Sequence, residues 1–253
     1  MEKRHVVRLG VICWAVMASA VFLPSASASI IGTLFTGSSG LITVTTTSIT
    51  WNTDPGATPP GTWNGEVANG TNLTFLGCTG ALNSPGCLAN GEGIDINHLG
   101  PFVNLVTVLP VNNFMTFATN PTLDFTLTAV SPGSANTNCF GLLVGQSCSV
   151  IAGSPIILTL LSGNRTDVAV SFAGTATDGS GQTSYWTGGF SATLPTMTPA
   201  TLESYFIANP NGSQSASNSG SFFVSTVPEP GTSALIGGAL IGLATLLRRR
   251  KSA

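Results

Sequence analysis

Basic residues are nearly absent from the middle of this chain of 253 residues. Three of the eight lysines and arginines precede residue 9 and four occupy residues 248–251, which leaves Arg165 alone in residues 29–226. The same segment contains eight acidic residues, so its formal charge is one minus eight, or −7. A surface of this sign repels the phosphates of nucleic acids, which excludes DNA and RNA as partners.

The residues that most often carry catalysis or bind metals are also scarce. His98 is the only histidine after residue 28, and no G-x-S-x-G nucleophile motif occurs. The four cysteines after residue 28 are not spaced as the CxxC pairs of zinc and redox sites. We therefore expect no enzyme, no metal site and no cofactor.

The first 28 residues have the layout of a secretory signal peptide. A basic start is followed by an apolar core over residues 9–23 and by a small-residue cleavage site. The residues at this site are Ala26, Ser27 and Ala28, followed by Ser29. We expect cleavage before Ser29, so that the mature chain is exported through the inner membrane.

The last 27 residues, 227–253, form a second targeting segment in three parts. The parts are a proline-bracketed acidic motif, an uncharged segment over residues 231–247 and a basic end. The prolines hold the motif extended, and 17 residues are near the short limit for a transmembrane helix. The basic end stays cytoplasmic, which places the motif on the far side of the membrane. The charged and proline-rich parts are Val227, Pro228, Glu229 and Pro230, then Arg248, Arg249, Arg250 and Lys251.

This three-part tail resembles the PEP-CTERM sorting signal of Gram-negative bacteria. The resemblance implies recognition by an exosortase, a membrane-embedded cysteine transpeptidase-like enzyme, with cleavage at or near Glu229. It also implies an exported protein that is transiently anchored by the C-terminal helix and then reaches the cell surface or the extracellular matrix. The alternative is a plain C-terminal membrane anchor.

The exported chain keeps four cysteines, which enter an oxidising compartment. Four cysteines allow three pairings. We favour the two pairings that each close a short glycine-containing loop, namely Cys78–Cys87 and Cys139–Cys148.

Residues 29–226 have the pattern of a β protein. Short runs of Val, Ile, Thr and Phe recur between Gly, Pro, Asn and Asp clusters, and no window shows a clear helical stripe. The clearest unit is a hairpin predicted over residues 166–194, with its turn at 177–181. Residues 122–130 alternate apolar Leu123, Phe125 and Leu127 with polar residues, which predicts one buried face. About ten to twelve such strands predict a single antiparallel β-sandwich.

Some stretches have less regular patterns. Threonines at 45–47 favour one continuous strand over residues 41–51. The polar, low-complexity residues 209–221 predict a loop, and residues 199–207 fit either a helix or a strand. Further strands are predicted at residues 73–76 and 102–109.

Three functions remain open for residues 29–226. The leading hypothesis is a non-enzymatic surface or matrix protein, structural or adhesive, that contacts exopolysaccharide or neighbouring cells. A carbohydrate-binding module would need exposed aromatic rings, for which Trp63 or Trp186 are the candidates. A secreted hydrolase would need Glu92, Asp95 and His98 to converge as acid and base, whereas the alternative for these residues is a solvated loop.

Overall fold

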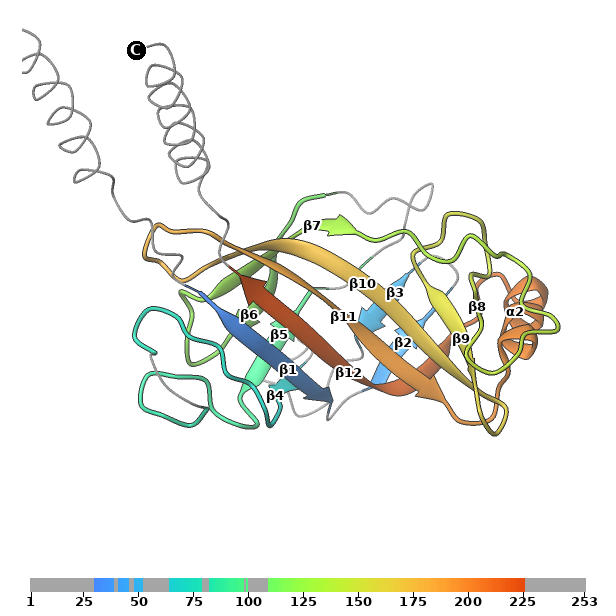
Figure 1. Cartoon of the computed structure of the whole chain (residues 1–253), viewed down its shortest axis with the longest axis horizontal. Helices are drawn as coiled ribbons and strands as arrows, with labels where there is room; N and C mark the ends of the chain where they lie inside the picture. Colours follow the sequence, from blue (N-terminus) through green and yellow to red (C-terminus); the bar gives the residue numbers. More distant parts are fainter. Residues whose placement is uncertain are drawn as a thin grey trace, which may run out of the picture. The chain divides into compact units, whose positions relative to one another are not determined.

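The computed structural model describes residues 30–38, 41–45, 48–51, 64–78, 82–97, 99 and 109–225 (Figure 1). The predicted signal peptide, the predicted sorting tail and almost all of the strand predicted at 102–109 lie outside these residues. The elements described below belong to one unit, Ala28–Pro228.

Strands make up nearly all of the regular structure of the described residues. The strands are β1 (Gly32–Ser38), β2 (Leu41–Val44), β3 (Ile49–Trp51), β4 (Asn64–Val67), β5 (Gly93–Ile96), β6 (Val111–Phe117), β7 (Asp124–Val130), β8 (Ser147–Cys148), β9 (Ile157–Leu161), β10 (Arg165–Thr177), β11 (Ser184–Leu194) and β12 (Gln214–Ser225). A helix, α2 (Pro199–Ala208), lies between β11 and β12.

Eight of these strands close into a ring. β12 pairs with β1, and the pairing continues through β4, β5, β6, β7, β10 and β11 back to β12, always antiparallel. The predicted all-β, antiparallel fold is therefore confirmed, but the predicted sandwich is not, because the strands form an eight-stranded barrel. Both architectures bury one face of each strand, so the alternation of residues does not distinguish them.

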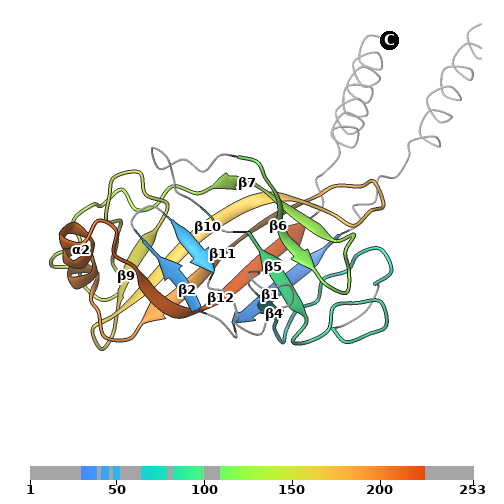
Figure 2. The same cartoon turned by 180° about the vertical axis from the view of Figure 1, so that it is seen from behind.

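The two longest strands, β10 and β12, connect the ring to a second, more open region. β12 pairs with β2 over Gln214–Ser217 and with β1 over Gly220–Val224, while β10 pairs first with β9 and then with β7. We call the end with Ile30, Ser225 and the β10–β11 turn the near end, and the opposite end, with α2, β8 and β9, the far end (Figures 1 and 2). The ring therefore closes toward the near end, and the paired strands β2–β3 and β8–β9 extend it toward the far end.

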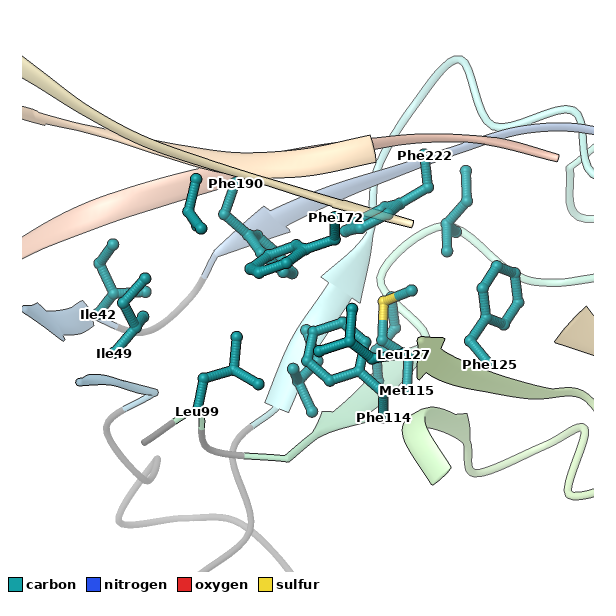
Figure 3. Close-up of a cluster of buried hydrophobic side chains, with 14 of the residues drawn as sticks. Ile42, Ile49, Leu99, Phe114, Met115, Phe125, Leu127, Phe172, Phe190 and Phe222 are labelled. Carbon is teal, nitrogen blue, oxygen red and sulfur yellow. The ribbon is translucent and has the colours of Figure 1, made fainter. Parts of the chain in front are cut away.

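Aromatic side chains fill the interior of the ring. Trp186 is 1 % exposed, and its ring lies 6.0 Å from Phe114, 5.9 Å from Phe125 and 5.6 Å from Phe222, measured between centroids. Its indole N–H donates to the Thr175 carbonyl at 3.0 Å. Figure 3 shows phenylalanines from β6, β7, β10, β11 and β12 projecting into this space. Eight strands enclose an interior that side chains can fill, as they do here.

Inward-facing glycines make room for these rings. A Cβ atom on Gly174 would lie 2.7 Å from the Trp186 ring, and one on Gly188 would lie 2.5 Å from Phe222. A Cβ atom on Gly220 would lie 2.7 Å from Phe190. The core thus alternates very large and very small residues across neighbouring strands.

This pairing of large and small residues explains a wrong prediction. Residues 214–221, expected to be part of a loop, form the first two thirds of β12. Ala216, Asn218 and Gly220 are buried and alternate with outward serines. Residues on this strand do alternate between inward and outward positions. The inward residues are small or polar rather than large and apolar, so the sequence by itself indicates a linker.

A second prediction failed at residues 41–51, which form two paired strands rather than one. Thr43 lies opposite Thr50 in the β2–β3 pairing. Between the strands, Thr45 Oγ1 accepts the Ser48 N–H at 2.9 Å, and the Thr45 N–H donates to the Ser48 carbonyl at 3.0 Å. Hydroxyl–backbone bonds of this kind stabilise a turn and outweigh the strand propensity of threonine.

Other predictions have mixed outcomes. The hairpin predicted at 166–194 is confirmed as β10–β11, with Thr166 opposite Leu194. Leu123, just before β7, and Phe125 and Leu127 within it are fully buried, as their alternation with polar residues predicted.

Residues 199–207 are helical, since the Thr198 hydroxyl caps the Thr201 N–H and Pro199 starts the helix. Residues 73–76 form only isolated bridges rather than the predicted strand.

Both predicted disulfides, Cys78–Cys87 and Cys139–Cys148, are present. A buried carboxylate binds the backbone beside each one. Asp178 Oδ2 accepts the Leu76 N–H at 2.7 Å at the near end, and Glu203 Oε2 accepts the Cys139 N–H at 3.2 Å at the far end. Each disulfide loop is thereby joined to a distant part of the fold.

Candidate functional site

The predicted processing sites lie outside the described residues. These are the signal cleavage site, the sorting motif at 227–230 and the basic end at 248–251. The chain leaves β12 at Ser225, two residues before Val227. The predicted transmembrane segment, 231–247, also lies outside the described residues, and among those that are described no helix is long and apolar enough to cross a membrane.

Glu92, the first member of the predicted acid–base cluster, is buried, and both of its carboxylate oxygens accept hydrogen bonds. Its Oε2 accepts the Ala89 N–H at 2.9 Å, and its Oε1 accepts the Thr119 N–H at 3.3 Å and the Thr119 hydroxyl. The carboxylate therefore joins two turns and does not face a substrate. Asp95 lies on β5, and His98 is outside the described residues.

Buried carboxylates that accept backbone N–H groups are a recurring feature of this fold. Glu92, Asp178 and Glu203 are each less than one tenth exposed. Asp178 uses both oxygens, since Oδ1 also accepts the Ser180 N–H at 3.1 Å. No local pattern in the sequence indicates these roles, because the N–H donors are up to 102 residues away.

Two further acids lie in one row on the outer face of the ring. Asp95 lies opposite Thr116, and Thr116 lies opposite Asp124. Partial burial raises the pKa of both carboxyl groups, and for Asp124 a hydrogen bond from the Phe125 backbone opposes the shift. The two carboxylates are separated by a whole strand, a Cα–Cα spacing of about 10 Å.

One of the two aromatic candidates for sugar stacking is buried. Trp186 is in the core and is not the exposed ring that a carbohydrate-binding module would need, and Trp63 is outside the described residues. The rings that the described residues expose are Tyr185 and Phe223, on adjacent strands near the chain exit, and Phe140 in the second disulfide loop. Phe223 follows the buried Phe222, so the strand alternation could have indicated that one ring of the pair faces outward.

A shallow, open hollow of about 910 Å³ lies on the outer face over β10, β11, β12 and β1. Its floor consists of small side chains, such as Ser171, Gly189 and Ser221, and the rings of Phe35 and Phe223 contribute to it. No Asp, Glu, His, Cys, Lys, Arg or Tyr is among the described residues that line it. The hollow can therefore offer hydroxyl groups, backbone groups and two aromatic rings, but no acid–base pair.

Comparison with known proteins identifies the tail. Residues 226–251 match the family model of the PEP-CTERM protein-sorting motif. The tail is a PEP-CTERM signal. The signal covers about a tenth of the chain, and neither the curated proteins nor the solved structures contain a match. A PEP-CTERM signal implies export to the cell envelope or surface and processing by an exosortase, and the match does not extend to the ring.

Proposed function

We propose that this chain is a surface or extracellular-matrix protein with a structural or adhesive ectodomain. It is held in the inner membrane by residues 231–247 and processed by an exosortase at or near Glu229. The observation that carries the proposal is the PEP-CTERM match at residues 226–251. The predicted signal peptide supports it, because export is needed to bring the motif to the enzyme.

The ectodomain, residues 29–226, acts without catalysis in this proposal. Glu92 is engaged with backbone and side-chain donors, and the hollow is lined by no titratable side chain among the described residues. A disulfide at each end and a core filled with aromatic side chains suit a protein that must remain folded outside the cell.

Contact with exopolysaccharide is the second part of the proposal, and the hollow supports it. Aromatic rings stack on sugar faces, and hydroxyl groups bond to sugar hydroxyls. Phe35, Phe223 and the outward serines supply both types of group on an uncharged surface. A glycan array on the ectodomain, with Phe35→Ala and Phe223→Ala as variants, tests this part. Neutral polysaccharide should bind the wild type and lose affinity in both variants, and no binding would leave a purely structural role.

The sorting step is tested in a host that has an exosortase. Glu229→Ala removes the charge of the motif while both prolines hold the chain extended, and the double change of Pro228 and Pro230 to Ala does the reverse. We expect either change to leave full-length, membrane-retained protein. Deletion of residues 248–251 should instead weaken retention before processing, because cytoplasmic charges hold the helix in place. Normal release of the Glu229→Ala protein would assign the cleavage to another protease.

A further inference from the structure

The large apolar side chains that the described residues expose fall mainly at the two ends of the fold. The near-end set is 48–62 % exposed and the far-end set is 60–69 % exposed. The near-end set is Ile31, Leu76, Tyr185 and Phe223. The far-end set is Phe140, Leu143, Val144 and Ile207.

The near-end set surrounds the point where the described chain ends. Tyr185 lies opposite Ser225 in the β11–β12 pairing, and Phe223 lies between Thr33 and Thr187 on the neighbouring strands. Ile31 exchanges two backbone hydrogen bonds with Thr74, at 3.0 and 2.8 Å, two residues before Leu76. These four side chains therefore belong to one end of the ring, at the chain exit.

The length of the chain limits how far this end can be from a membrane. Five residues, 226–230, separate Ser225 from the apolar segment that begins at Gly231. Five extended residues span at most about 20 Å, and the prolines favour that extended form. A chain anchored through residues 231–247 therefore holds the near end beside the lipid head groups.

The chemistry of the near end suits a lipid surface. Its neighbouring outward residues carry hydroxyl groups rather than charges, as at Thr33, Thr187 and Ser225. Asp178, whose carboxylate accepts the Leu76 N–H, is buried and bonded to backbone N–H groups, and Asp124, opposite Thr177, lies on β7 rather than on the strands that carry the set. Contact of the set with the bilayer would thus remove apolar area from water without desolvating the Asp178 carboxylate. Tyrosine is a residue enriched at membrane–water interfaces.

We propose that the near-end set, Ile31, Leu76, Tyr185 and Phe223, rests on the bilayer surface while the chain is anchored. This contact holds the near end at the interface, where a membrane-embedded enzyme acts. Four side chains alone bind lipid weakly, so the ectodomain leaves the surface once the tail is cleaved. The inference rests on the membrane-held stage of the proposed function.

The test uses the full chain in phosphatidylcholine vesicles that contain a phosphatidylcholine with a diazirine on its acyl chain. No exosortase is present, so lipid is the available partner. After illumination, mass spectrometry locates the labelled residues. We expect label on the near-end set and on residues 231–247, and several-fold less label on the far-end set, which serves as an equally apolar internal control.

The outcomes separate the two proposals. Label on the tail but not on the near end would overturn this inference and leave the anchor intact. Absence of label from both would overturn the inference together with the membrane-held stage. Equal label at both ends would show non-specific adsorption and also overturn it. In a variant with all four near-end residues changed to Ser, tail labelling should persist while labelling of the near end is lost. The matched far-end quadruple variant should label like the wild type.

Discussion

The near and far ends of the ectodomain are built from the same parts but have different surroundings. Each has a disulfide of nine-residue separation and a buried carboxylate that accepts an N–H from beside it. At the near end these parts lie beside a closed ring, where every strand has two partners. At the far end they hold short strands and one helix. We infer that the ring provides most of the stability of the ectodomain. At the far end, the Cys139–Cys148 disulfide is therefore more important for holding the local structure than Cys78–Cys87 is at the near end.

The largest expected effect is in the ring. Trp186→Ala should lower the free energy of unfolding by about 3–5 kcal/mol, because it leaves a cavity among Phe114, Phe125 and Phe222. Denaturant unfolding measures the change. Phe223→Ala, on the next strand but exposed, is the control and should change stability by less than about 0.5 kcal/mol. Equal losses in the two variants would show that the ring interior is not the stabilising core.

Removal of the disulfides tests the two ends directly. Both loops have the same length, so replacing either cysteine pair with serine should cost about 2–3 kcal/mol in the chain-entropy description. Hydrogen exchange should distinguish the pairs. Loss of Cys139–Cys148 should loosen β8, β9 and α2 together, whereas loss of Cys78–Cys87 should loosen only the loop around it. Loosening of β1 and β12 in the second variant would contradict the view that the ring sustains the near end.

The buried carboxylates should have smaller and unequal effects. Asp178 accepts two N–H groups and Glu203 accepts one among the bonds described here. Leaving such donors unpaired costs about 1–3 kcal/mol. We therefore expect Asp178→Ala to destabilise the protein more than Glu203→Ala, as measured by thermal unfolding. A larger loss of stability in Glu203→Ala would mean that the carboxylate–backbone contact at the far end is the more important of the two.

The smallest expected effect is a dependence on pH. Partial burial raises the pKa of Asp95, Asp124 and Asp167, and Asp124 Oδ1 has no hydrogen-bond partner among the described residues. An aspartate in the unfolded chain titrates near a pKa of about 3.9. The folded state therefore binds more protons between that value and the raised one. The stability that these groups add at low pH should be lost as the pH rises through this window.

Asp124→Asn sharpens this expectation, because asparagine removes the charge and keeps the shape. The variant should be at least as stable as the wild type at pH 7, with a weaker dependence of stability on pH above the ordinary aspartate pKa of about 3.9. Chemical unfolding at several pH values measures both quantities. A variant less stable than the wild type at pH 7 would mean that the hydrogen bond from the Phe125 backbone outweighs the cost of burying the Asp124 charge.

Most local features of the fold followed from the sequence, apart from the turn between β2 and β3 and the strand expected at residues 73–76, and the long-range ones did not. Strand alternation predicted the burial of Leu123, Phe125 and Leu127, and short glycine-containing loops predicted both disulfides. The closed ring was missed because its period is that of a sandwich. The first two thirds of β12 were missed because the inward positions are small or polar, as at Asn218 and at Gly220, which lies against Phe190.

The functional features divide in the same way. The PEP-CTERM signal is continuous in sequence, so its residues were found without a structure. The roles of Glu92, Asp178 and Glu203 depend on donors 27, 102 and 64 residues away, which no local pattern reveals. The near-end set likewise exists only because the ring brings together segments that begin and end the ectodomain.

The central claim is that the PEP-CTERM signal determines the fate of the ectodomain. The most direct measurement is the C-terminal residue of the released protein, read by mass spectrometry in matched strains with and without the exosortase. Our account predicts release with an end at or near Glu229 in the first strain and full-length, membrane-retained protein in the second. Release of the same product without the exosortase would contradict it.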